Sequence, residues 1–96
     1  MIESFGNSLA EELFLDRKGK ETRRFPNELW RQARRKILYL HEAEELGDLR
    51  VPPGNRLEAL RGNYRGFFSI RINDQWRVVF RWESGHAYQV SVIDYH

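Results

Sequence analysis

Hydrophobic side chains recur at helical spacing near the middle of the chain. They share one stripe of a 3.6-residue period, and the positions on the other side are mostly basic. Pro26, Asn27 and Glu28 stand where a helix is expected to start. The pattern predicts a helix over residues 27–41. The stripe is formed by Leu29, Trp30, Ala33, Ile37 and Leu40.

Weaker signals on both sides of this helix predict the remaining elements of the first half. Asn7 or Ser8 can cap a helix that runs to about Leu15, with acidic residues in its early turns. The other predicted segments are a short strand at 2–5, a polar loop at 16–24, a helical turn at 42–46 and a rigid extended connector at 51–55.

The second half alternates apolar and polar residues, which predicts strands with one buried face and one open face. A three-residue loop at 73–75 pairs Ile70 with Val78 and keeps the apolar face unbroken. A second three-residue loop at 83–85 pairs Val78 with Val90. The expected strands lie near 67–72, 76–82 and 88–93.

Length and composition restrict the class of protein. A chain of 96 residues with 41% hydrophobic and 14% aromatic residues predicts a single folded domain, residues 1–96. No cysteine is present, which excludes disulfides and thiolate chemistry and is consistent with the reducing cytoplasm. The longest apolar run is Ile37–Leu40 and the first residues lack a signal-peptide pattern, so we expect no membrane association.

Charge is distributed unevenly although the formal net charge is only +2. Residues 17–36 hold nine Lys or Arg against two Glu, and residues 42–48 hold four acidic residues without a Lys or Arg. Residues 50–82 hold seven Arg, no Lys and two acidic residues. Exclusive use of arginine suits planar contacts with phosphate, which favours a nucleic-acid or other anionic partner over ordinary solvated charge.

The predicted register places arginines on the open face of the sheet. Arg71 lies opposite Arg77, and Arg81 lies opposite Phe67 and Ala87. Like charges directly opposite each other are unfavourable, so an anion between Arg71 and Arg77 is expected; the alternative is that both side chains extend into solvent. The same register places Ile93 beside Gln75, and Asp94 beside Asp74.

The last three residues could supply groups for metal-independent RNA cleavage beside Arg77. Attack of a 2′-hydroxyl on the adjacent phosphate needs a base, an acid and a cation. His96 titrates nearest neutral pH and suits the acid or base role, Asp94 can orient or accept a proton, and Tyr95 can stack on a base. Alone, a final histidine is more often an ordinary exposed residue. The histidines His41, His86 and His96 follow no zinc spacing, so no metal or cofactor is expected.

Three segments resemble the HigB-type toxins of bacterial type II toxin–antitoxin systems, within the RelE/ParE superfamily. They are Pro52–Gly62, Ser69–Trp82, which contains Asn-Asp-Gln-Trp-Arg, and Val92–His96, which ends in Asp-Tyr-His. The resemblance covers nearly the whole chain. It implies an α+β fold with two N-terminal helices packed on a small, mainly antiparallel, curved sheet.

The resemblance also implies a function. It implies a ribosome-dependent mRNA endoribonuclease that inhibits translation in the cytoplasm. The expected partners are the ribosome, mRNA and a HigA-type helix-turn-helix antitoxin, with operator DNA reached only through the antitoxin complex. The expected catalytic residues are Asp94, Tyr95, His96, Arg77 and Glu58, and the expected RNA- or phosphate-binding residues are Arg56, Arg61, Arg71 and Arg81.

Glu58 departs from the pattern, because some characterised relatives have histidine at this position. Glutamate is a poor general acid near neutral pH, so Glu58 is expected to act as a base or to form a salt bridge with Arg61. The alternative is an ordinary surface carboxylate at the end of a strand.

Two other functions fit parts of the sequence. A ParE-like DNA gyrase inhibitor would use the same fold without acid–base groups, and DNA breaks with intact mRNA would identify it. A non-catalytic RNA-binding module would explain the arginines equally well, and RNA binding without cleavage would identify it.

Overall fold

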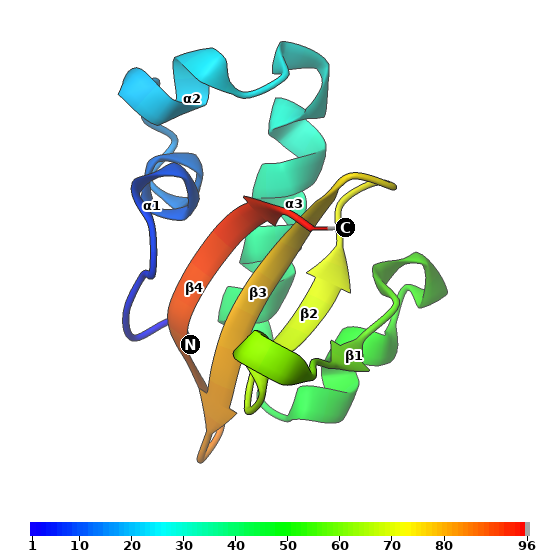
Figure 1. Ribbon diagram of the computed structural model, residues 1–96. Helices are drawn as coiled ribbons and strands as arrows, with labels where there is room; N and C mark the ends of the chain where they lie inside the picture. Colours follow the sequence, from blue (N-terminus) through cyan, green and yellow to red (C-terminus); the bar gives the residue numbers. More distant parts are fainter. Residues whose placement is uncertain (96) are drawn as a thin grey trace.

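A four-stranded antiparallel sheet, with strand order β1-β2-β3-β4, forms the centre of the fold. The computed structural model describes residues 1–95. Helices α1 and α3 cover one face of the sheet, while the bright-green segment that contains η4 crosses in front of β3 on the other face (Figure 1). This is the expected α+β class. The helical elements are α1 (Ser8–Phe14), α2 (Lys20–Arg24), η1 (Asn27–Leu29), α3 (Trp30–Glu42), η2 (Leu46–Arg50), η3 (Pro53–Asn55) and η4 (Gly62–Tyr64), and the strands are β1 (Glu58–Ala59), β2 (Phe68–Arg71), β3 (Trp76–Glu83) and β4 (His86–Asp94).

Both predicted helices, the one capped at Asn7 or Ser8 and the one over residues 27–41, are confirmed. The side chain of Asn7 caps α1 by accepting the N–H of Ala10 at 3.0 Å. The short 3-10 turn η1 leads into α3, so the helical region closely matches the predicted 27–41. Leu13 of α1 and Ile37 of α3 are fully buried in one hydrophobic cluster with the inner face of the sheet.

The prediction of a loop over residues 16–24 is wrong for its second half, which forms α2. The carboxylate of Glu12 in α1 accepts the N–H of Thr22 at 2.9 Å and its Oγ at 2.6 Å. Gly19 allows this approach, since a Cβ there would lie 2.5 Å from Cδ of Glu12. A partner ten residues away therefore stabilises α2, and the local composition does not reveal it.

The contact between Glu12 and Thr22 predicts an acid-sensitive part of the stability. The Thr22 hydrogen bonds hold the pKa of Glu12 below its ordinary value of 4.5. The stabilisation is therefore present above pH 4.5 and is lost as the pH falls through the lowered pKa of the folded state. We expect Glu12→Gln to lower the Tm at neutral pH and to make the Tm decline less as the pH falls. Thermal unfolding measured by circular dichroism at several pH values tests this. The exposed neighbour Glu11 provides a control: Glu11→Gln is expected to keep the wild-type acid profile.

The connector between α3 and the sheet differs from its prediction. The carboxylate of Asp48 accepts the N–H groups of Glu44 and Glu45 at 3.0 Å, and the helical turn expected at 42–46 forms instead at η2. The segment 51–55 is extended only as far as Pro52, because η3 follows. These turns are fixed by contacts of their own polar side chains.

Fully buried Asn55 closes this connector onto α3. It donates to the carbonyls of Leu49 at 3.1 Å and Val51 at 3.3 Å, and it accepts from Nζ of Lys36 at 2.5 Å. Burial, followed by the charges of Arg35 and Arg71, lowers the pKa of Lys36. This buried network fixes the approach of the chain to β1.

The register predicted for the first hairpin is confirmed. Ile70 pairs with Val78, Phe68 pairs with Phe80, and Arg71 pairs with Arg77. The side chain of Asn73 accepts the N–H of Gln75 at 2.9 Å, which supports the three-residue loop.

The register predicted for the second hairpin is wrong. Its loop has two residues, Ser84 and Gly85, with φ of 50° and 83°, and the strands restart at a Glu83–His86 pair. A bulge at Gln89, with φ of 52°, then adds one residue to β4. Val78 consequently pairs with Val92 rather than Val90, and Arg81 pairs with Tyr88 rather than Ala87. Ile93 pairs with Arg77 rather than lying beside Gln75, and Trp76 pairs with Asp94.

The two-residue loop also reverses which side chains point inward near the start of β4, before the bulge is reached. Ala87 is fully buried in the core cluster, whereas Tyr88 lies outside it. Val90 and Val92 remain buried as predicted, because the extra residue restores their alternation. At the other end of the chain, the strand expected at 2–5 contributes two isolated parallel bridges, from Ile2 to Ala87 and from Phe5 to Val90.

Among residues 1–95, no helix combines the length and the apolar character that crossing a membrane requires.

Candidate functional site

The sheet has a second face, which the helices leave uncovered. Strand residues that alternate with the core positions point toward it. A segment between β1 and β2, residues 61–67, lies over part of this open face and helps to bury Val79. The residues on the open face include Arg71, Arg77, Arg81, Ser91 and Ile93.

Arg77 is the most firmly anchored of the arginines predicted for the site. Its guanidinium donates to Oγ of buried Ser69 at 3.0 Å, and it lies 3.5 Å from the Glu58 carboxylate and 5.7 Å from the centre of the Tyr95 ring. Only 17% of the Arg77 side chain is exposed. These contacts, made from β1, β2 and the residue after β4, fix a positive charge near one end of β3 on the open face.

A hollow of about 440 Å³ opens beside this arginine, and we call it the Glu58–Arg61 hollow. It is lined by Glu58 and Arg61 from the β1 region and by Tyr95 beyond β4. The structure thus brings four predicted site residues together: Glu58, Arg61, Arg77 and Tyr95. The expected salt bridge from Glu58 to Arg61 is wrong, because the Glu58 carboxylate lies against Arg77 instead.

Asp94 lies at the same end of the sheet but has the opposite orientation. It pairs with Trp76 and so shares the strand face of Val92, whereas Tyr95 contacts Arg77 on the open face. The Asp94 carboxylate accepts from Nε2 of Gln75 at 2.9 Å, and the N–H of Tyr95 donates to the Gln75 carbonyl at 2.9 Å. The prediction that Asp94 lies beside Asp74 is therefore wrong. His96, predicted to act as an acid or a base, lies outside the described residues.

Arg71 and Arg56 lie toward the β2–β3 turn. The guanidinium of Arg71 contacts the Asp74 carboxylate at 2.5 Å, and this hydrogen bond and charge, with a smaller effect of Arg56, lower the pKa of Asp74. Arg71 and Arg77 are opposite each other, as predicted, but each has a carboxylate of its own. The chain's own carboxylates therefore relieve the repulsion that had predicted an anion between the two arginines.

Arg81 marks the far end of the open face. Its guanidinium lies 4.4 Å from the centre of the Phe67 ring, and the side chain is exposed to solvent. A Cβ on Gly66 would lie 3.4 Å from the Arg81 guanidinium, so glycine permits this close approach. Arg81 is separated from the Glu58–Arg61 hollow by aromatic side chains.

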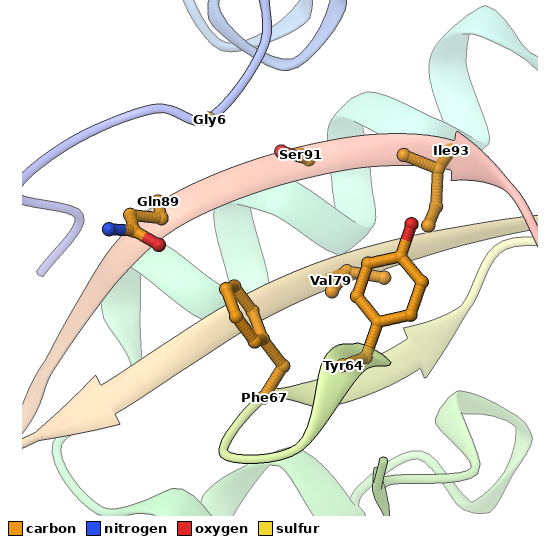
Figure 2. A pocket seen from close by; sticks show the side chains of 7 residues that line it. All are labelled: Gly6, Tyr64, Phe67, Val79, Gln89, Ser91 and Ile93. Atoms are coloured by element: carbon orange, nitrogen blue, oxygen red, sulfur yellow. The ribbon is translucent and has the colours of Figure 1, made fainter. Parts of the chain in front are cut away.

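Those aromatic side chains line a second cavity of about 450 Å³, which we call the Tyr64–Phe67 cavity (Figure 2). Figure 2 shows the two rings on one side and β4, with Gln89 and Ser91, on the other, with Val79 between them. No sequence pattern predicted this cavity, although Gly62 and Gly66 on either side of Tyr64 signal a tight loop that presents an aromatic ring.

Comparison with solved structures establishes the fold. The YoeB–YefM complex from Staphylococcus aureus contains a chain that matches with a TM-score of 0.61 at 17% identity, covering 100% of this chain and 98% of that chain. The YoeB dimer from the same organism matches with a TM-score of 0.59 at 18% identity, covering 99% of this chain and 94% of that chain. At this identity the similarity concerns the fold alone.

Comparison of sequences goes further. The chain is 39% identical over 87 residues to Toxin HigB-1 of Vibrio cholerae serotype O1, covering 91% of this chain and 90% of that protein. It is 35% identical over 54 residues to Endoribonuclease HigB of Proteus vulgaris, covering 56% of this chain and 58% of that protein. Residues 3–96 match the model of the HigB-like toxins, described as RelE-like toxins of the type II toxin–antitoxin system HigB. The resemblance seen in the sequence is thus confirmed, and the chain belongs to the HigB-like toxin family.

Proposed function

We propose that this chain is a ribosome-dependent endoribonuclease that cleaves mRNA and thereby inhibits translation. One observation supports this most directly: a carboxylate, an anchored guanidinium and a phenol meet at the Glu58–Arg61 hollow of a HigB-like toxin. The name of the Proteus vulgaris relative, an endoribonuclease, is consistent with it.

The proposed reaction is metal-independent attack by a ribose 2′-hydroxyl on the adjacent phosphorus. The new P–O bond forms as the bond to the 5′ oxygen breaks, which gives a cyclic phosphate and a free 5′-hydroxyl. A base must accept the 2′ proton, an acid must protonate the departing 5′ oxygen, and a cation must stabilise the additional charge on phosphate.

The residues at the hollow suit these roles in different ways. Arg77, fixed by Ser69 and Glu58, is the proposed cation, and Arg61, which lines the hollow, is a further phosphate contact. Glu58, with 51% of its side chain exposed, is the proposed base. Tyr95 presents a ring for stacking or a hydroxyl for donation. His96 is the proposed acid, and Asp94 is the residue proposed to orient it.

Partner recognition follows from the distribution of charge. The arginines of the open face and the basic residues 17–36 provide many phosphate contacts, so we expect association with ribosomes to weaken steeply as salt rises.

Toxins of type II systems act with an antitoxin, and we propose a HigA-type helix-turn-helix protein in this role, within the cytoplasm. Operator DNA would then be reached only through the antitoxin complex.

Induction of the chain in growing cells, followed by mapping of RNA ends, tests the proposal. We expect new mRNA 5′ ends within translated regions, and we expect them to disappear when translation initiation is blocked. His96→Ala is expected to abolish them. Intact mRNA with accumulating DNA breaks would favour gyrase inhibition instead, and RNA binding without cleavage would favour a non-catalytic module.

Glu58→Gln tests the role of the carboxylate separately. The amide keeps the size of the side chain and an oxygen that can accept from Arg77, but it cannot accept a proton at neutral pH. If Glu58 is the base, cleavage on ribosomes is expected to fall by about 10²- to 10⁴-fold. Full activity of this variant, with an unchanged pH profile, would restrict Glu58 to positioning Arg77.

A further inference from the structure

A row of aromatic rings with an arginine at each end follows the open face of the sheet. The guanidinium of Arg77 lies 5.7 Å from the Tyr95 ring centre, and the Tyr95 and Tyr64 ring centres lie 5.9 Å apart. The Tyr64 and Phe67 ring centres lie 6.1 Å apart, and the guanidinium of Arg81 lies 4.4 Å from the Phe67 ring centre. Proteins bind single-stranded RNA through this combination of stacking rings and cationic groups.

The Tyr64–Phe67 cavity occupies the second half of this row. Its volume of about 450 Å³ lies within the range of small-molecule sites. The Tyr64 and Phe67 rings stand at 88° to each other, so they form two walls of a corner rather than filling the space between them. A flat ring that stacks on one wall meets the edge of the other, which is a favourable aromatic geometry.

The side of the cavity facing these rings carries hydrogen-bonding groups. The Gln89 amide and the Ser91 hydroxyl lie along β4, across Val79 from the two rings (Figure 2). An amide both donates and accepts, and so does a hydroxyl, which suits the edge of a nucleobase. The bulge leaves Gln89 outside the regular pairing with β3, and bulges of this kind redirect a side chain.

The N-terminal segment packs closely against the β4 side of the cavity. A Cβ on Gly6 would lie 2.3 Å from Oγ of Ser91 and 2.8 Å from the Gln89 carbonyl oxygen, so a side chain cannot occupy this position without displacing β4. The described lining residues carry no charged side chain, while Arg77 and Arg81 stand beyond the two ends of the aromatic row. A neutral, flat group attached to a chain of phosphates fits this distribution.

We propose that the Tyr64–Phe67 cavity holds one unpaired nucleobase next to the RNA linkage that lies at the Glu58–Arg61 hollow. Tyr64 supplies the shared wall, because its ring lines this cavity and also contacts Tyr95, which lines the hollow. Arg81 then contacts a phosphate farther along the strand. This inference rests on the proposed function for the position of the cleaved linkage.

Fluorescence of a short single-stranded RNA tests the cavity independently of cleavage. A 2′-O-methyl RNA cannot undergo 2′-hydroxyl attack, and a single 2-aminopurine in it is quenched when the base stacks. We expect the wild-type chain to quench it, Phe67→Tyr to retain the quenching, and Phe67→Ala to weaken binding by roughly 5- to 100-fold. The exposed Arg50 provides a control, since Arg50→Ala should leave binding unchanged.

Mapping of cleaved mRNA ends provides the second readout. Ser91→Ala is expected to change the base preferred beside the cut by at least several-fold while total cleavage persists. The inference is overturned if the wild-type chain does not quench, if Phe67→Ala quenches normally, or if Ser91→Ala keeps the wild-type base preference. If the wild-type chain cleaves no RNA but Phe67-dependent quenching is seen, the base site is supported and only the proposed cleavage fails.

Discussion

Replacing Arg77 with alanine is expected to lower mRNA cleavage on ribosomes by about 10²- to 10³-fold. The pentacoordinate phosphate of the proposed reaction carries more negative charge than the starting linkage. The guanidinium of Arg77 is fixed before the reaction by Ser69 and Glu58, so it stabilises that charge with little reorganisation. The rate should be measured in single turnover on purified translating ribosomes, together with the growth of cells expressing the variant.

Two comparisons separate this effect from loss of structure. Arg77→Ala leaves the buried Ser69 hydroxyl without its donor, which is expected to cost about 1 kcal/mol of stability and to leave the chain folded. Arg77→Lys keeps the positive charge, but an ammonium lacks the planar group that contacts Ser69 and Glu58 together. We therefore expect this variant to retain only part of the activity. Arg50→Ala removes an exposed arginine elsewhere and should cleave normally. Wild-type cleavage by Arg77→Ala would remove this residue from the site.

The sequence predicted those elements of the fold that depend on local periodicity. The stripe on α3 and the alternation along β2 and β3 each bury a continuous apolar face, so only one orientation or register was acceptable. The second hairpin was mispredicted because the structure has both a shorter loop and a bulge, and neither was expected. A two-residue turn shifts the pairing by one residue, and the bulge at Gln89 shifts it again, so the apolar pattern of Val90 and Val92 remains satisfied. Alternation alone cannot distinguish this from a three-residue loop.

In the candidate site, too, the features that depend on strand periodicity could be predicted and those that depend on tertiary contacts could not. Arg77 could be placed on the open face because its strand register was predictable, and its opposition to Arg71 was correct. The carboxylates that accompany the two arginines could not be predicted as partners, because Glu58 reaches Arg77 from a two-residue strand and Asp74 folds back within its turn. The Tyr64–Phe67 cavity depends on how the 61–67 segment crosses the sheet, which is a tertiary property without a periodic signal.

Phe80→Ala is expected to produce the largest loss of stability of any variant considered. Phe80 is fully buried in the cluster between the sheet and α1 and α3, and its ring packs against Phe68 at 6.1 Å and Trp82 at 6.4 Å. Removing a buried phenylalanine typically costs about 3–5 kcal/mol. A domain of this size has a total free energy of unfolding of roughly 5–15 kcal/mol. Urea denaturation should therefore show a greatly reduced midpoint, with part of the population unfolded in buffer at the lower end of that range.

Phe67→Ala is the matched control, because it removes the same side chain from the open face. Phe67 is only half-buried and contacts Tyr64 and Arg81 rather than the helices, so its loss is expected to cost about 1 kcal/mol or less. The comparison tests the division of the sheet into a supporting face and a binding face. A strong loss of stability in Phe67→Ala would mean that the 61–67 segment is part of the core, and the cavity it forms would then be a packing defect rather than a site.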